Sequence, residues 1–334
     1  MMLRYEVAAH YTKPYDPPRG FPGLALRGAL GHALHTLYCT RPSHKCTACP
    51  RYTKCPYALL YETTPATDKS GDIALAQQAV TNPYTLEVIY SGEKGIGFAL
   101  NLFGDATSHY REALTALLYA ATLGIGYSKR HAERRRLSVE RITQEIPLHR
   151  TRTIVYKDGA VHTDALPRRP PRSLLASFAP QAKKIYEDEP SLLEIEFKAP
   201  YRLSNPQQAY TPSYRHLLMT IARRYSLLAA YHKAGRRLTL RDARSLAALA
   251  DTVQTLEAVH GPLIKVTKRS IVTGEKKGYG LFATHGRILY RLPPDYWKHP
   301  LAPLSAALIM AGQYLHAGKL ATAGYGRYIA RFYV

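Results

Sequence analysis

The sequence is poor in acidic residues. Only 24 Asp and Glu accompany 46 Lys and Arg, which leaves a formal net charge of +22 over 334 residues. Such an excess of one sign causes self-repulsion unless a negatively charged partner compensates it. The scarcity of carboxylates also provides no convincing ligand set for a catalytic Mg²⁺ ion. The composition therefore favours a nucleic-acid partner and does not favour catalysis by a divalent metal.

Long hydrophobic runs are also missing. No apolar run approaches the ~20 residues that span a bilayer. The amino terminus, residues 1–7, alternates like a strand and lacks the basic-then-apolar pattern of a signal sequence. We therefore expect a cytoplasmic protein with no membrane partner.

Phenylalanine and tryptophan are scarce, with 7 and 1 copies, whereas tyrosine occurs 26 times. Tyrosine offers a flat ring for base stacking and a hydroxyl for phosphate or sugar, so its abundance in a basic chain favours single-stranded or looped RNA. Two simpler explanations stay open. Many of these tyrosines would be half-buried in strands, and the chain would be a merely basic enzyme.

The order of predicted elements repeats along the chain. The first half predicts strands at 3–11, 84–90, 96–103 and 136–139, and helices at 24–38 and 108–123. The second half predicts strands at 192–197, 264–271, 280–292 and 327–334, helices at 214–232 and 305–315, and extra helical material at 236–260. Strand-helix-strand-strand-helix-strand is the ferredoxin-like order. We expect an α+β protein with two tandem ferredoxin-like (RRM-like) domains at 1–145 and 191–334, and a linker region at 146–190.

The first predicted helix carries histidines on one side. A helical projection places Leu26, Leu30, Ala33, Leu34 and Leu37 on the core-facing stripe, and Gly28, Gly31, His32, His35 and Cys39 on the opposite one. Cleavage of RNA by its own 2′-hydroxyl needs a base, an acid and a cation near phosphorus. Imidazoles can transfer both protons at neutral pH without any metal. The leading catalytic candidates are His32 and His35, followed by Tyr38 and His44.

All four cysteines of the chain follow this helix, within a loop at 39–55. The spacing Cys39-x6-Cys46-x2-Cys49-x5-Cys55 is typical of a metal centre and is a poor disulfide framework. Four thiolates would complete a tetrahedral zinc sphere, so the site would be structural. A [4Fe–4S] cluster is the alternative metal group. The simplest explanation of the cysteines is a set of reduced, buried thiols.

A glycine-rich motif follows the last predicted helix. A dinucleotide-binding motif would follow a strand, and no strand precedes this one. Glycines leave the backbone uncovered next to cationic side chains, which allows a polyanion to approach closely. A basic stretch around Lys268 and Arg269 fits a hairpin that contacts phosphates, or a solvated edge strand. The predicted RNA-binding residues are Lys268, Arg269, His316, Gly318, Lys319, Gly324, Gly326 and Arg327.

Several of these segments together resemble a known family. They are residues 26–34, 55–58, 102–104, 124–126, 315–319 and 324–328. The chain resembles the CRISPR-associated repeat-processing endoribonucleases, the sixth Cas protein family within the RAMP superfamily, in a variant with a four-cysteine loop. The resemblance implies metal-independent, sequence-specific cleavage of CRISPR precursor RNA within its repeats, with 5′-hydroxyl and 2′,3′-cyclic phosphate ends. It also implies that the protein retains the crRNA product and associates with a CRISPR effector complex, and that the catalytic histidine is His32, His35 or His44.

Two other functions compete with this interpretation. A non-cleaving crRNA-binding subunit would keep the glycine-rich motif but would not need its histidines. A metal-cluster DNA-processing protein would depend on the cysteines and would prefer DNA.

Overall fold

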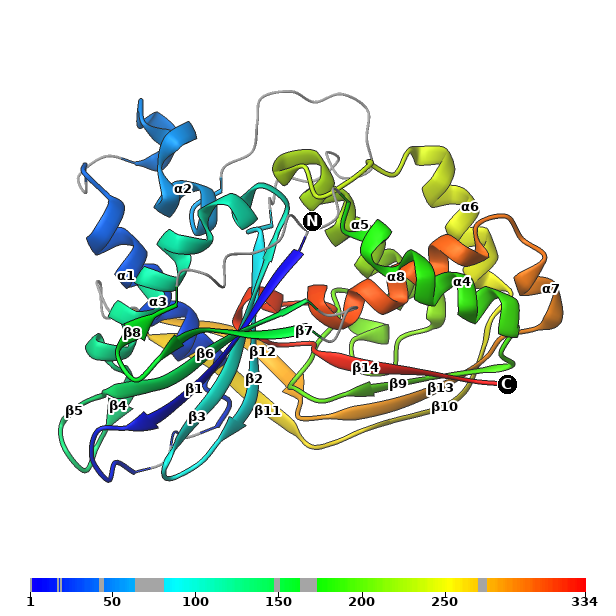
Figure 1. The fold of residues 1–334 in the computed structure, drawn as a ribbon. Helices are drawn as coiled ribbons and strands as arrows, with labels where there is room; N and C mark the ends of the chain where they lie inside the picture. Colours follow the sequence, from blue (N-terminus) through cyan, green and yellow to red (C-terminus); the bar gives the residue numbers. More distant parts are fainter. Residues whose placement is uncertain are drawn as a thin grey trace. The chain divides into compact units, whose positions relative to one another are not determined.

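The computed structural model describes residues 2–16, 18, 20–41, 45–63, 81–146, 151–162, 173–269 and 275–334. Within these ranges the chain forms two compact units (Figure 1). The first contains the described residues up to 162 together with Tyr231–Ala234, and the second contains 173–230 and 235–334. Within the described ranges, no helix combines the length and the apolar character needed to cross a bilayer. The candidate His44 lies outside the described residues.

The first unit is built on an antiparallel sheet with the order β2-β3-β1-β6-β7-β8. These strands are β1 (Met2–Tyr11), β2 (Tyr84–Ser91), β3 (Gly95–Phe103), β6 (Leu137–Ile146), β7 (Thr151–Lys157) and β8 (Ala160–Val161). Helices α1 (Gly23–Tyr38) and α3 (Tyr110–Leu123) bury their apolar residues against one face of the sheet (Figure 1). The order β2-β3-β1-β6 with two covering helices is the predicted ferredoxin-like pattern, extended at one edge by β7 and β8.

Additional short elements connect these parts of the first unit. They are η1 (Cys46–Ala48), η2 (Tyr52–Lys54), α2 (Pro56–Leu60), η3 (Gly104–His109), β4 (Ile125–Ser128) and β5 (Glu133–Arg135). The strands β4 and β5 form a small separate hairpin between α3 and β6. This hairpin was not predicted, because the first strand expected after the helix was at 136–139.

The second unit repeats the arrangement, with the sheet order β10-β13-β9-β14. Its elements are η5 (Leu175–Phe178), α4 (Ala179–Asp188), β9 (Leu192–Phe197), η6 (Pro206–Gln208), α5 (Tyr214–His232), α6 (Leu240–Asp251), β10 (Gln254–His260), β11 (Leu263–Arg269), β12 (Lys276–Ala283), β13 (Gly286–Arg291), α7 (Pro294–Trp297), α8 (Ala302–Leu315), η7 (Ala321–Ala323) and β14 (Tyr328–Tyr333). The fold class predicted from the sequence is therefore confirmed.

Two segments of the second unit differ from their predictions. Only α6 of the region 236–260 is helical, and Gln254–His260 forms the edge strand β10. The predicted strand 280–292 is two strands, β12 and β13, because the chain turns at residues 284–285. Strand β12 pairs with β11 in a hairpin outside the main sheet, whereas β13 lies between β10 and β9. Periodicity alone could not show this change of sheet, since both strands have compatible alternation.

The region predicted as a linker, 146–190, contains regular structure where it is described. Strand β7 pairs with β6 and extends the first sheet. Helix α4 packs on α8 through a small cluster of Ala182, Ala306 and Ala307 in the second unit. The prolines and arginines that suggested a linker lie at 167–172, outside the described residues.

Many tyrosines have a structural role in the two cores. The fully buried ones are Tyr5, Tyr84, Tyr201, Tyr214, Tyr225, Tyr290, Tyr296 and Tyr328. In the second unit the hydroxyl of Tyr214 lies 2.8 Å from that of Tyr296 and 2.8 Å from Ser305 Oγ. Buried rings cannot stack on bases, so tyrosine abundance is weaker evidence for RNA binding than the sequence suggested.

Candidate functional site

Helix α1 carries three of the predicted catalytic residues, His32, His35 and Tyr38. Leu26, Leu30, Ala33 and Leu34 are buried as predicted, whereas Leu37 is 40% exposed, because the last turn of α1 is no longer covered by the core. His32 and His35 are half-buried on the other side of the helix, one turn apart. Both imidazoles are thus partly accessible, whereas Gly31 of the same predicted stripe is buried.

The ionisation of His32 is shifted toward the neutral form. Burial lowers its pKa below the ordinary value, and the positive charges of Arg134 and of His35 lower it further. A neutral imidazole at physiological pH is suited to accept a proton. An environment that favours the neutral imidazole is compatible with a proton acceptor at His32.

Arg134 reaches His32 because β4 and β5 pack beside α1. A β-carbon at Gly126 of β4 would contact Ala25 of α1 at 3.7 Å, so this strand runs close to the helix. The hairpin is fixed by Arg135, whose Nε donates to the carbonyl of Asp16 at 2.7 Å and whose Nη2 pairs with its carboxylate at 2.8 Å. The sequence alone did not assign Arg134 to the site, since the packing of its hairpin beside α1 is a tertiary feature.

The surroundings of His35 are formed by the segment that follows the cysteine loop. The His35 ring contacts the Tyr57 ring edge-on, with centroids 5.0 Å apart. Tyr57 in turn stacks on Tyr61, with centroids 5.8 Å apart. The guanidinium of Arg27 lies 4.3 Å from the Tyr61 ring centre and donates to its hydroxyl at 2.9 Å. This row of rings orients His35 from one side. It also explains the nearby Gly31, since the Tyr61 ring occupies the space that a β-carbon there would need.

Tyr38 is engaged differently from the histidines. Its hydroxyl donates to the backbone carbonyl of Glu112 on α3 at 3.4 Å, and its ring packs against the core. Burial raises its pKa, opposed by a hydrogen bond with Thr115 and supported by the charge of Glu112. A protonated hydroxyl directed at α3 favours a packing role for Tyr38.

The four cysteines lie around one pocket of about 330 Å³. Burial raises the pKa of the Cys46 thiol, and the other three cysteines raise it further. All four are reduced and half-buried. Within the described ranges, no three Cys, His, Asp or Glu side chains converge in an arrangement that could hold a metal ion. The loop thus gathers the predicted ligands around one pocket without closing them into a coordination sphere.

The predicted glycine-rich motif forms a compact loop between α8 and β14. Gly318, Gly324 and Gly326 have φ of 90°, 85° and 72°, which favours glycine at each position. A β-carbon at Gly326 would overlap the carbonyl oxygen of Ala317, and one at Gly318 would overlap that of Arg202. These glycines therefore have a structural requirement of their own.

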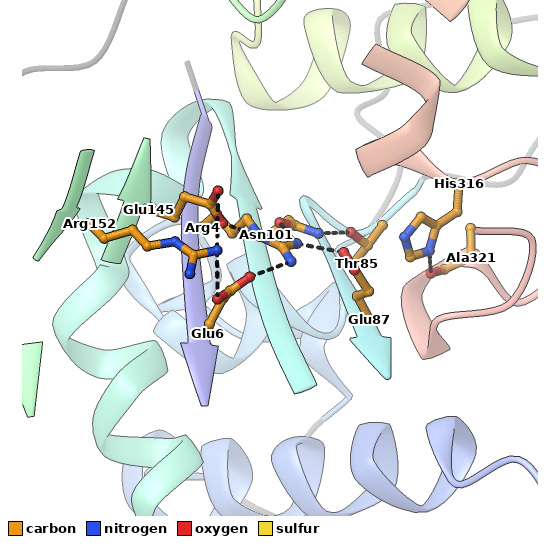
Figure 2. Close-up of polar contacts among 9 residues, drawn as sticks. All are labelled: Arg4, Glu6, Thr85, Glu87, Asn101, Glu145, Arg152, His316 and Ala321. Atoms are coloured by element: carbon orange, nitrogen blue, oxygen red, sulfur yellow. Dashed lines mark hydrogen bonds and ion pairs between the residues drawn. The ribbon is translucent and has the colours of Figure 1, made fainter. Parts of the chain in front are cut away.

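His316 and Lys319 occupy opposite environments in this loop. The His316 side chain is fully buried, and its Nδ1 lies 3.2 Å from the carbonyl oxygen of Ala321 (Figure 2). It shapes the loop from inside. Lys319 is exposed, and its backbone amide donates to the carbonyl of Arg202 at 2.9 Å. Arg327, immediately before β14, is half-buried.

The hairpin of β11 and β12 lies against the glycine-rich loop. Tyr325 of the loop contacts Phe282 of β12 edge-on, with centroids 5.2 Å apart, and Tyr201 and Ala283 exchange backbone hydrogen bonds of 2.9 and 3.0 Å. The predicted residue Lys268 is half-buried on β11, and Arg269 ends this strand. The structure thus brings both predicted RNA-contacting segments into one surface of the second unit.

The cations of this surface differ from those of the sheets. Lys265, Lys276, Lys277 and Lys319 are exposed, and no carboxylate in the described part of the chain pairs with them. On the main sheet of the second unit, by contrast, Glu194 binds Arg287 at 2.7 Å and Arg331 at 2.5 Å. The hairpin and loop therefore offer unneutralised charge to a polyanion, whereas the sheet neutralises its own.

The sheet of the first unit is neutralised in a similar way. Arg4 is buried on the face opposite to α1 and α3 and binds Glu87 at 2.5 Å, Glu6 at 2.9 Å and Glu145 at 3.0 Å (Figure 2). Its Nη1 also donates to Asn101 at 3.2 Å. Three carboxylates therefore neutralise the charge of this buried arginine.

Comparison with known protein families agrees with these features. The model of the CRISPR-associated endoribonuclease Cas6 matches residues 195–328, which contain the hairpin and the glycine-rich loop. A second family model, described as an N-terminal domain and named AF_1859_N, matches residues 1–168, which contain the histidine helix. No curated protein sequence matched the chain.

Solved structures show the same fold. A Cas6 product complex superposes with a TM-score of 0.53 at 15% identity, covering 99% of this chain and 100% of that one. Cas6 of Thermus thermophilus gives 0.50 at 13% identity, covering 99% and 98%. A partial Cas6-RT-Cas1–Cas2 complex gives 0.52 at 12% identity, and there the chain covers 46% of its counterpart. With the family model and the shared fold, the chain belongs to the CRISPR-associated Cas6 endoribonuclease family.

Proposed function

We propose that this chain cleaves CRISPR precursor RNA within its repeats and afterwards holds the crRNA product. The observation that carries the proposal is the His32 imidazole, whose pKa is lowered by burial and by Arg134 and His35, on a helix of a Cas6-family chain. The solved Cas6 relative that resembles this chain was determined as a product complex, which supports retention of the product.

The proposed reaction is a transesterification that consumes no water. Neutral His32 takes the proton of a 2′-hydroxyl, and the 2′-oxygen forms a bond to the adjacent phosphorus. The bond from phosphorus to the 5′-oxygen breaks, and a second histidine, His35 or His44, gives its proton to that leaving oxygen. Arg134 supplies positive charge for the phosphorane-like transition state. The products are a 2′,3′-cyclic phosphate and a 5′-hydroxyl, and no divalent ion takes part.

The test uses repeat RNA in excess EDTA and the same RNA with one 2′-deoxy nucleotide at the cut position. We expect cleavage of the first and none of the second, with end-group analysis showing a cyclic phosphate. His32→Ala, His35→Ala and His44→Ala are compared with His162→Ala, an exposed histidine at the end of β8. A loss of rate of roughly 10²–10⁴ in the variant that lacks a proton-transfer group is the expected size.

The same assay separates cleavage from passive binding. A non-cleaving crRNA holder would bind the repeat without products, and its binding would not change in the three histidine variants. Cleavage of the 2′-deoxy RNA, or a triple histidine variant with the wild-type rate, would rule out the proposed chemistry. A preference for DNA over RNA would instead favour the DNA-processing function.

We further propose that the four cysteines hold a structural metal ion, with zinc as the first choice and a [4Fe–4S] cluster as the alternative. The donor chemistry fits, since four thiols line a single pocket next to α2. Binding would draw the thiolates together and fix the segment that carries Tyr57 and Tyr61. The metal would act on structure and would take no part in the proton transfers. We also propose that the crRNA-bound protein joins a CRISPR effector complex.

A further inference from the structure

Arg202 lies where the glycine-rich loop and the β11–β12 hairpin meet in the second unit. Its carbonyl oxygen accepts the 2.9 Å hydrogen bond from Lys319, and its Nη1 donates to the carbonyl of Tyr279 on β12 at 3.1 Å. Its guanidinium fills the space that a side chain at Gly280 would need. One residue therefore contacts both halves of the candidate RNA surface.

The guanidinium of Arg202 has few partners. It is half-buried, yet no carboxylate in the described part of the chain forms an ion pair with it. Its Nε is buried without any hydrogen-bond acceptor, and among the described residues Tyr279 provides the one acceptor for the whole group. Arg287 and Arg331, which are more exposed, share the carboxylate of Glu194. A partly desolvated cation without a counter-ion is a preferred position for an external anion.

The neighbours of Arg202 indicate which anion would bind. On the loop side, the neighbour of Arg202 is the exposed Lys319. On the hairpin side it is Lys277, which lies on β12 together with Tyr279, the acceptor of the Arg202 guanidinium. Both lysines are exposed on the surface, which suits contacts with the phosphates of a polymer. A planar guanidinium can bind two oxygens of one phosphate, which a lysine cannot.

We propose that Arg202 binds one specific phosphate of the RNA backbone, between the contacts made by the loop and those made by the hairpin. This inference rests on the proposed function, because it assumes that the surface binds repeat RNA. It adds a residue that neither the sequence motifs nor the basic stretches included. The contact would also fix the hairpin relative to the loop, since the same guanidinium holds Tyr279.

The experiment combines protein variants with RNA in which single phosphates are replaced by uncharged methylphosphonates. Arg202→Gln retains a donor for Tyr279 but loses the charge, and Arg202→Lys retains the charge but loses the fork. We expect Arg202→Gln to weaken binding at moderate salt and to reduce the salt dependence of log K by about one phosphate. Methylphosphonates at the contacted phosphates should weaken wild-type binding, and one of these positions should no longer matter in Arg202→Gln. Arg202→Lys should restore the salt dependence but only part of the affinity.

A purely structural role predicts a different pattern. In that case Arg202→Gln would weaken binding equally for every methylphosphonate position and leave the salt dependence unchanged, and the inference would be wrong. If Arg202→Gln does not fold, as judged by its melting curve, Arg202→Lys carries the test. The phosphate that responds to Arg202 should still be sensitive in this variant, but with a smaller effect than in the wild type because the fork is lost; no sensitive phosphate, or an effect as large as in the wild type, would contradict the inference. A wild type that binds no repeat RNA would contradict the proposed function itself, whereas normal wild-type binding without a selectively sensitive phosphate contradicts only the role of Arg202.

Discussion

The ring of Tyr61 occupies the space above Gly31 of helix α1. This contact joins the segment after the cysteine loop to helix α1, which carries the candidate catalytic residues His32 and His35. Tyr61 in turn stacks on Tyr57, and Tyr57 contacts the ring of His35. The position of one candidate catalytic side chain is thereby linked to the loop in which a metal centre is proposed.

Gly31→Ala is expected to displace Tyr61. An alanine improves helix propensity by about 1 kcal/mol, but overpacking at this site costs about 1–3 kcal/mol, so the free energy of unfolding should fall slightly. Denaturant unfolding measures this change. The double variant Gly31→Ala/Tyr61→Ala provides the control, because it removes the clash; if the single variant is more stable than the wild type, the contact has been misjudged.

Arg134→Met should raise the pKa of His32 toward its ordinary value, because a positive charge that opposes protonation is removed. For a general base, the rate rises with pH until the imidazole is neutral. The ascending limb of the pH–rate profile should therefore lie below pH 6.5 in the wild type and move to higher pH in the variant. Arg141→Met on β6, with an exposed side chain, should leave the limb in place. An unchanged limb in Arg134→Met would show that His32 is not the titrating base.

Gly326→Ala should disrupt the glycine-rich loop. A non-glycine residue at φ 72° costs about 1–2 kcal/mol, and the new β-carbon would also overlap the Ala317 carbonyl. We expect a lower melting temperature and weaker RNA binding. Gly92→Ala, in the turn between β2 and β3, is the control, since nothing lies within 4 Å of its β-carbon position; equal effects of the two substitutions would argue against the loop geometry.

Lys319→Ala should weaken RNA binding about equally for all repeat sequences and reduce the salt dependence of log K by about 1. The comparison is Lys183→Ala on α4, an exposed lysine that pairs with Glu187 at 3.6 Å. Binding titrations at several salt concentrations provide the measurement. A change in the cut position, with unchanged affinity, would be inconsistent with a contact to the phosphate backbone.

Metal analysis of the purified protein should find about one zinc ion per chain, or iron with sulfide if the site holds a cluster. Cys49→Ser should lose the metal and lower the melting temperature, while cleavage in EDTA should persist in the metal-loaded wild type over a short assay. A chain that carries no metal after purification under reducing, chelator-free conditions would refute the proposed centre.

Much of the fold was accessible from local patterns. Alternating and helical periodicities located β9 and α5 at the predicted bounds, and the buried stripe of α1 followed its spacing up to Leu34. The assignment was less successful at Leu37 and in the region 280–292. The exposure of Leu37 and the division of 280–292 into two strands depend on where neighbouring elements end. Sequence periodicity carries no information about those ends.

The candidate site shows the same division. The sequence by itself determined the residue types: histidines on one helix face, cysteines in one loop, and glycines where φ is positive. The tertiary structure alone placed Arg134 near His32, Tyr57 against His35, and Arg202 between the loop and the hairpin. It also buried eight of the tyrosines that had suggested base stacking. Local spacing fixes which face of an element a residue occupies, but contacts between residues distant in the chain arise only when the elements pack.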